Sequence, residues 1–209
     1  MVADFKFNKM ITGIDISDKN GLFDLDHWVG KGIRFAYIKA TEALDSADRC
    51  FSDNRSRAQK NGLLTGAYHW LHPRLHVEQQ ARFFMETVSD FAGMLPPVVC
   101  LTTHRAPMEQ IERNVKTFIE VLRKHTGSKP VIFTSIDYWQ KYLSHAGWAS
   151  EYPLWVDFPG GNFPPQLYPW AGWTFWQYSY QANLPGILSE VGINYFNGND
   201  EELINMVIQ

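Results

Sequence analysis

The chain has little of several features that would assign it to a particular class of protein. It contains only two cysteines, Cys50 and Cys100, in 209 residues. Their wide separation fits neither the usual spacing of metal ligands nor a disulfide-rich framework, and the sequence leaves open whether they pair. No hydrophobic run is long enough to predict a membrane span. We therefore expect a protein with no metal, no cofactor and no membrane-spanning segment.

An excess of positive charge is also missing. The formal net charge is -3, with basic and acidic residues interspersed, so no basic stripe indicates binding to nucleic acid. The N-terminal residues MVADFKFNKMITG contain neither an apolar stretch nor a small-residue cleavage site. The sequence thus predicts no signal peptide, synthesis in the cytoplasm, and partners that are neutral molecules or proteins.

The chain is instead rich in short β-type runs that alternate with helical segments. Residues such as Ile111, Val115, Phe118 and Leu122 recur at helical spacing and predict a helix with one buried face. Strand and helix alternation favours a parallel sheet with helical crossovers, and eight strands favour closure into a barrel. The length suits one domain over residues 1–209. The expected strands cover 11–17, 33–41, 64–70, 97–102, 130–135, 153–158, 173–179 and 187–196, and the expected helices fall within 51–62, 74–91, 107–127 and 135–147.

Functional side chains of such barrels lie at the C-terminal ends of the strands, where the loops leave the barrel open. Both polar and aromatic residues occupy these ends, a mixture that suits a carbohydrate groove because rings stack on sugars while amides and carboxylates bind hydroxyls. The candidates are Asp15, Lys39, Glu42, Tyr68, His69, Cys100, Thr102, Thr134, Asp157, Trp176 and Gln177.

Eight motifs follow one another along residues 11–198: GIDIS (13–17), LDHW (25–28), FAYIKATE (35–42), GAYHW (66–70), LPPVV (95–99), PVIFTS (130–135), LWVDF (154–158) and WTFWQYS (173–179). In this order they resemble glycoside hydrolase family 25, the Chalaropsis-type lysozymes of fungi, bacteria and bacteriophage endolysins. The resemblance implies an α/β fold, an irregular TIM-like barrel of about eight strands and five helices. It also implies a substrate, the glycan of peptidoglycan, cleaved between N-acetylmuramic acid and N-acetylglucosamine.

The chain departs from the family at its acidic residues. The strand after Leu-Pro-Pro usually reads V-L-D-L-E, and here Cys100 stands at the Asp position and Thr102 at the Glu position. Gly192 stands where the family commonly has an Asp in V-D-x-N, so only Asp15 of the usual acids is retained. A threonine hydroxyl cannot serve as the general acid, and a thiol is mostly neutral unless its pKa is lowered.

Another carboxylate offers a replacement. Asp157 follows the sixth expected strand, and a pair formed by Asp15 and Asp157 would recreate an acid and a base, although an Asp at a barrel mouth is more often a hydrogen-bonding group. Glu42 is interpreted as a substrate-positioning residue or a partner of Lys39. The expected ligand-binding residues are Glu42, Tyr68, His69, Trp155, Trp176 and Gln177.

Several of these assignments have structural alternatives. His69 is either a ligand-binding residue or a hydrogen-bonded residue of the barrel wall. The tryptophans are either sugar platforms or core residues, and strand alternation places Trp176 on the face opposite Trp173 and Gln177. The proline-rich segment 159–172 is expected to be a loop that rims the groove, contacts a partner or packs on its own aromatics.

Three hypotheses for function follow. The favoured one is a muramidase-like domain that has lost hydrolysis, a pseudoenzyme that serves as a peptidoglycan-binding or structural module. Such a module would belong to a phage tail, an injection apparatus or another envelope-contacting assembly, either as a particle component or released to the cell envelope. The alternative is an active N-acetylmuramidase that uses displaced acids such as Asp15 and Asp157. A third is that the groove binds no glycan and the outer surface docks a protein partner.

Overall fold

A computed structural model describes residues 10–20, 30, 32–102, 106–160, 162–180 and 191–209 of the chain. The LDHW motif at 25–28 and the first part of the eighth expected strand, residues 187–190, lie outside the described residues. The other expected strands can all be compared with the structure.

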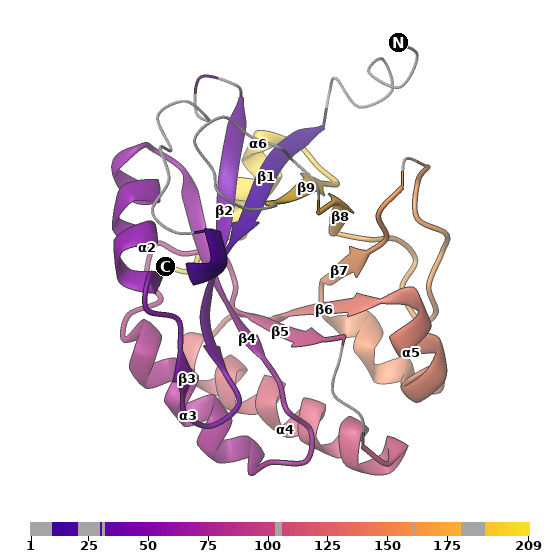
Figure 1. Ribbon diagram of the computed structural model, residues 1–209. Helices are drawn as coiled ribbons and strands as arrows, with labels where there is room; N and C mark the ends of the chain where they lie inside the picture. The colour runs from indigo at the N-terminus through magenta and orange to yellow at the C-terminus, as the bar shows by residue number, and fades with distance from the viewer. Residues whose placement is uncertain (1–9, 21–29, 31, 103–105, 161, 181–190) are drawn as a thin grey trace.

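The strands form a closed barrel (Figure 1). Their order is β1-β9-β8-β7-β6-β5-β4-β2-β3, and an additional pairing of β1 with β2 closes the ring. Neighbouring strands of the ring are parallel except that β9 runs antiparallel to β1 and β8. The eight-stranded barrel is therefore confirmed. The strands are β1 Ile11–Ile16, β2 Ile33–Glu42, β3 Ser46–Ala47, β4 Leu64–Trp70, β5 Val98–Leu101, β6 Val131–Ser135, β7 Leu154–Asp157, β8 Phe175–Ser179 and β9 Gly192–Phe196.

Four short elements were not predicted: β3, α6 and the 3-10 helices Asp18–Asn20 and Gly147–Glu151. β3 is a two-residue strand that pairs with the end of β2 and lies outside the ring. α6 (Asp200–Asn205) begins at Asn199, whose side chain forms a reciprocal capping box with Glu202. This capping pattern is visible in the sequence, but the helix has six residues and buries only Leu203, too few for a periodic signal.

Helices cover the outside of the barrel. The four helices predicted from periodicity are α2 (Phe51–Lys60), α3 (Val77–Val88), α4 (Met108–Thr126) and α5 (Ile136–Tyr142). The predicted apolar face of α4 is buried throughout, and this helix packs beside α3 (Figure 1). With α6 the described residues contain five α-helices, as the family resemblance implies, and none is long and apolar enough to cross a bilayer.

Side chains from alternate strand positions fill the barrel interior. Phe35, Tyr37 and Phe175 are fully buried there in edge-on ring contacts. Gly66 on the neighbouring strand provides the space for Tyr37, because a Cβ atom at position 66 would lie 2.1 Å from that ring. The packed interior leaves the barrel open only where the strands end, as expected for barrels of this kind.

The segment between β7 and β8 has no helix among its described residues. Trp170 anchors it, because its indole is buried against Trp139 with ring centroids 4.4 Å apart and donates a hydrogen bond to the carbonyl of Tyr152. Phe163 and Tyr168 are instead exposed. The prediction of a loop is thus confirmed, and Trp170 attaches the loop to α5.

Candidate functional site

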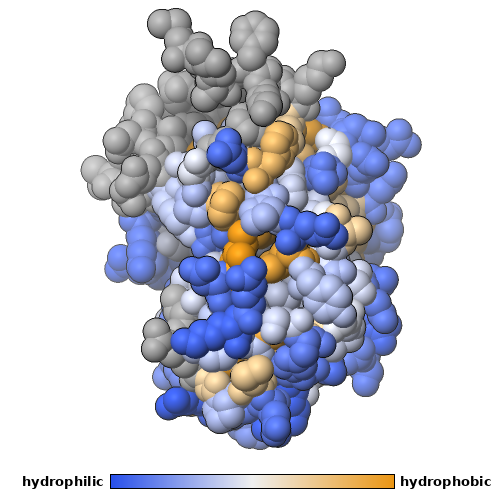
Figure 2. Space-filling view, turned by 90° about the vertical axis from the view of Figure 1, so that its right-hand side faces the viewer, coloured by the Kyte–Doolittle hydropathy of each residue, from blue (hydrophilic) through white to orange (hydrophobic). Residues whose placement is uncertain are grey.

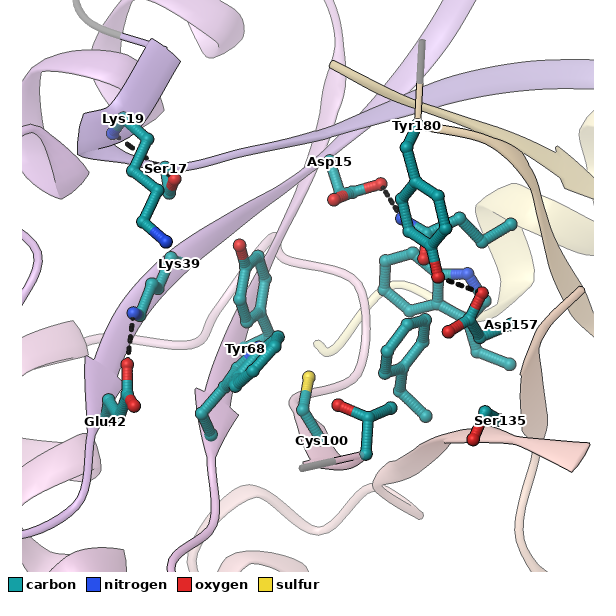
Figure 3. A pocket seen from close by; sticks show the side chains of 15 residues that line it. Asp15, Ser17, Lys19, Lys39, Glu42, Tyr68, Cys100, Ser135, Asp157 and Tyr180 are labelled. Atoms are coloured by element: carbon teal, nitrogen blue, oxygen red, sulfur yellow. Dashed lines mark hydrogen bonds and ion pairs between the residues drawn. The ribbon is translucent and has the colours of Figure 1, made fainter. Parts of the chain in front are cut away.

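A cleft of about 590 Å³ lies at the C-terminal ends of the strands. Figure 2 views the molecule from the side towards which β5 and β6 point, and a small hydrophobic area at the centre of this face is bordered by hydrophilic residues. Figure 3 shows the side chains that line the cleft. They are Asp15, Ser17, Lys19, Lys39, Glu42, Tyr68, Trp70, Cys100, Thr102, Phe133, Ser135, Trp155, Asp157, Gln177 and Tyr180.

Asp15, the acid that the family resemblance implies is retained, is held by two amide groups. Its Oδ1 accepts hydrogen bonds from Gln177 Nε2 at 2.6 Å and from Asn194 Nδ2 at 2.8 Å. Burial raises the pKa of Asp15 from its usual 3.8 to about 6, the two amides oppose this shift, and the charge of Asp157 adds to it. The other carboxyl oxygen faces the open middle of the cleft (Figure 3). The pKa of Asp15 therefore lies closer to neutral pH than that of an exposed aspartate.

Trp155 fixes the orientation of one of these amides. Its Nε1 can only donate, and it donates to Asn194 Oδ1 at 3.0 Å. Asn194 must therefore present its Nδ2 group to Asp15, and Asp15 Oδ1 must be an acceptor. A buried chain of hydrogen bonds that starts in the barrel core thus fixes the carboxyl group of Asp15.

Gly192 on β9 provides the space that this carboxyl group occupies. A Cβ atom at position 192 would lie 1.8 Å from Asp15 Oδ1 and 2.6 Å from Gln177 Nε2. No side chain fits at position 192 while Asp15 keeps this arrangement. Gly192 and the present position of Asp15 therefore depend on each other.

Asp157 is the second carboxylate of the cleft. It ends β7, is partly buried, and accepts a hydrogen bond from the hydroxyl of Tyr180. Burial raises the pKa of Asp157, and the hydrogen bond from Tyr180 acts in the opposite direction. In adjacent strands Asp157 is the register partner of Gln177, so Asp15, Gln177 and Asp157 form one contiguous group, which we call the carboxyl end of the cleft.

The lysine end of the cleft comprises Lys19, Lys39 and Glu42. Lys39 Nζ lies 2.6 Å from Glu42 Oε2 and 5.8 Å from the ring centroid of Trp70. Figure 3 shows these residues on the side of the cleft opposite Asp157 and Tyr180. The pairing of Lys39 with Glu42 that the sequence offered as one interpretation is present, and Glu42 lines the cleft.

Cys100 and Thr102 form the floor of the cleft where the family resemblance implies the acidic pair. Cys100 is 5% exposed, and burial raises the pKa of its thiol well above the usual range. Thr102 Oγ1 is buried without a hydrogen-bond partner among the described residues. The floor is therefore neutral, and both cysteines are free thiols.

Two of the expected ligand-binding residues lie elsewhere. His69 is fully buried between the sheet and the helices, where its ring contacts Phe118 and its Nδ1 lies 2.7 Å from Thr41 Oγ1. Trp176 is fully buried on the outer side of β8 and donates to the carbonyl of Phe158. Placing either residue in the groove was wrong, because both side chains point away from the barrel axis.

Strand alternation explains these placements. Tyr68, Trp155 and Gln177 point inwards and line the cleft, whereas their chain neighbours point outwards. Trp173, expected on the face of Gln177, instead packs against Trp176, because β8 begins only at Phe175 and alternation does not extend to residue 173.

Sequence reasoning missed Tyr180 and Asn194. Asn194 is the last residue of the VGIN segment, where the prediction considered only the absence of an acid at position 192. Strand alternation would have placed Asn194 on the same face of β9 as Gly192. Tyr180 follows β8 directly, and no sequence signal indicated its bond to Asp157. Among the described residues, no group of three histidine, cysteine or acidic side chains gathers to hold a metal ion.

Comparison with known proteins identifies the barrel. The family described as glycosyl hydrolases family 25 matches residues 14–187. The chain belongs to this family. The uncharacterized protein YegX of Escherichia coli O157:H7 is 34% identical over 199 residues, which cover 92% of this chain and 72% of YegX. Lysozyme M1 of Streptomyces globisporus is 29% identical over 206 residues, covering 93% and 70%.

Solved structures agree with this assignment. The bacterial lysozyme from Streptomyces coelicolor superimposes with a TM-score of 0.90 at 28% identity, covering 96% of this chain and 98% of that one. The fold of the chain is therefore the family 25 lysozyme fold.

Proposed function

We propose that this family 25 barrel binds the glycan of peptidoglycan in its cleft and does not hydrolyse it. The observation that carries the proposal is the neutral floor at the end of β5, formed by Cys100 and Thr102. Glycoside hydrolysis of the usual kind needs one carboxyl group to protonate the leaving oxygen and a second to act as nucleophile or base. A buried thiol with a raised pKa and a threonine hydroxyl supply neither function.

The rest of the cleft supports glycan binding. Aromatic rings from Tyr68, Trp70 and Trp155 stand beside carboxyl, amide and amino groups, the combination that stacks on sugar rings and binds their hydroxyls. The chain is similar to proteins named lysozyme M1 and N,O-diacetylmuramidase. We infer that this chain binds the same type of polymer as these proteins but does not share their activity. It would then serve as a binding or structural module of an assembly that contacts the cell envelope.

Hydrolysis with displaced acids is the second candidate, and one observation favours it. Asp15 and Asp157 both line the cleft, and the pKa of Asp15 is raised to about 6, a value suited to a general acid near neutral pH. Against it, Asp157 is already bound by Tyr180 and lies on β7 instead of β5.

Incubation of the purified protein with peptidoglycan sacculi tests both candidates. We expect the protein to sediment with sacculi while mass spectrometry detects no soluble muropeptides beyond those of a heat-inactivated control. Muropeptides with a muramic acid reducing end, released by the wild type but not by Asp15→Asn or Asp157→Asn, would establish the second candidate instead. Protein that stays in the supernatant would refute glycan binding.

A further inference from the structure

The carboxyl end of the cleft presents three acceptor groups that stand next to one another. Asp157 and Gln177 are register partners on β7 and β8, and Gln177 Nε2 donates to Asp15 on β1. In Figure 3 the carboxyl groups of Asp15 and Asp157 lie on the same side of the cleft beside Tyr180, away from the lysine end. A ligand group that enters here meets acceptors from three strands.

One of these acceptors is buried and has no donor. Gln177 is 3% exposed, and its Oε1 has no hydrogen-bond partner among the described residues because its Nε2 is directed to Asp15. A buried acceptor without a donor is unfavourable and rare in native proteins. Gln177 Oε1 therefore indicates that a bound ligand supplies a hydrogen-bond donor at this place.

The two carboxyl groups also have no basic partner in the described part of the chain. Among the described residues no lysine, arginine or histidine forms a salt bridge with Asp15 or Asp157, and the charge of Asp157 disfavours ionisation of Asp15. Like charges in one partly buried site repel each other, and a cation placed between them removes this repulsion.

We propose that the carboxyl end binds the protonated primary amine of an amino sugar, such as the glucosamine units of a de-N-acetylated glycan. An ammonium group carries three N–H donors and no acceptor, which matches Asp15, Asp157 and Gln177 Oε1. The ring of Tyr180, which also lines the cleft and is 41% exposed, adds a surface that attracts cations. The inference rests on the proposed function, because it takes the ligand to be a glycan.

Two other ligand groups fit less well. A neutral acetamido group offers one N–H donor and a carbonyl oxygen that two carboxylates would repel. A calcium ion requires six to eight oxygen ligands, whereas only three side chains meet here and Tyr180 already occupies one oxygen of Asp157.

The test compares two chitin-derived tetrasaccharides, one fully N-acetylated and one fully de-N-acetylated, by titration calorimetry at the same pH and ionic strength. We expect the de-N-acetylated sugar to bind about tenfold more tightly, as charged hydrogen bonds usually provide. Asp157→Asn, which keeps the shape of the side chain, should abolish this preference. Glu86→Gln on the exposed surface of α3 makes the same chemical change outside the cleft and should retain it.

The outcomes separate this inference from the proposed function. Sacculi that bind equally well before and after chemical N-acetylation would refute amine recognition while glycan binding stands. If neither sacculi nor either tetrasaccharide binds, both proposals fall. As a last control, calcium chloride is titrated into the protein without sugar. If heat of binding appears with the wild type and is absent with Asp157→Asn, the carboxyl end is a metal site and the inference is overturned.

Discussion

Position 192 illustrates how one residue sets the geometry of a whole site. Gly192 has no side chain, and Asp15 Oδ1 occupies the volume that its Cβ atom would need. The two amides that bind Asp15 hold it over this glycine. A side chain at position 192 and Asp15 in its present place therefore exclude each other.

Gly192→Ala tests this close approach. The added methyl group overlaps Asp15 Oδ1, so we expect the free energy of unfolding to fall by about 1–3 kcal/mol, measured by urea denaturation. Gly172→Ala is the matched control, because a Cβ atom there meets nothing within 4 Å. Equal stability of the two variants would show that Asp15 moves aside without cost.

At the scale of elements, a single carboxylate joins α4 to the segment that follows α5. Glu112 on α4 lies 2.9 Å from His145 Nε2, 2.9 Å from Trp148 Nε1 and 2.8 Å from Lys116 Nζ. These hydrogen bonds lower the pKa of Glu112 from 4.5 to about 2. The folded-state pKa is depressed, so this contribution to stability is present above pH 4.5 and is lost as the pH falls towards 2.

Glu112→Gln removes the charge and keeps an acceptor for Trp148. Because the partners are partly exposed, we expect a loss of about 0.5–1 kcal/mol at neutral pH, and the difference from wild type should vanish in strong acid. Urea denaturation across pH measures it. Glu120→Gln, which breaks a pair within α4 only, should change less, and a larger effect there would contradict a role in joining the elements.

At the scale of the whole molecule, two buried groups make opposite contributions to the pH dependence of stability. Burial lowers the pKa of His69 from 6.5 to about 4, so its contribution favours the folded state above pH 6.5 and declines as the pH falls towards 4. Asp15 has a raised pKa of about 6, so its contribution favours the folded state in acid and declines as the pH rises from 3.8 to 6. Between pH 4 and 6 the changes in folding stability caused by His69 and by Asp15 therefore largely cancel.

Asp15→Asn removes the pH-dependent contribution of Asp15 to stability and leaves that of His69. Asn has the same shape, and its side-chain oxygen still accepts from Gln177 and Asn194. We expect the variant to lose stability on acidification from pH 6.5 to about 4 more steeply than the wild type, by an amount of order 1–2 kcal/mol. Urea midpoints over this range measure the difference, and parallel curves for the two proteins would refute opposing contributions.

The elements were predictable because local patterns determine them. The strands and the four longer helices follow from apolar periodicity, and the barrel follows from their alternation. α6 and β3 were missed because six and two residues carry too little pattern. His69 and Trp176 were predicted to bind ligand because both lie near strand ends, but their side chains point outwards, as alternation predicts for Trp176 and as the barrel-wall alternative holds for His69.

The sequence by itself determined the barrel, the family and the presence of Cys100 and Thr102 at the end of β5, because these depend on residue identity and order along the chain. Only the tertiary structure decided which polar groups meet. Gln177 and Asn194 bind Asp15 across 162 and 179 positions of sequence, and Tyr180 reaches Asp157 from the next strand. Such contacts arise from the closure of the barrel, which brings strand ends that are distant in sequence to one cleft.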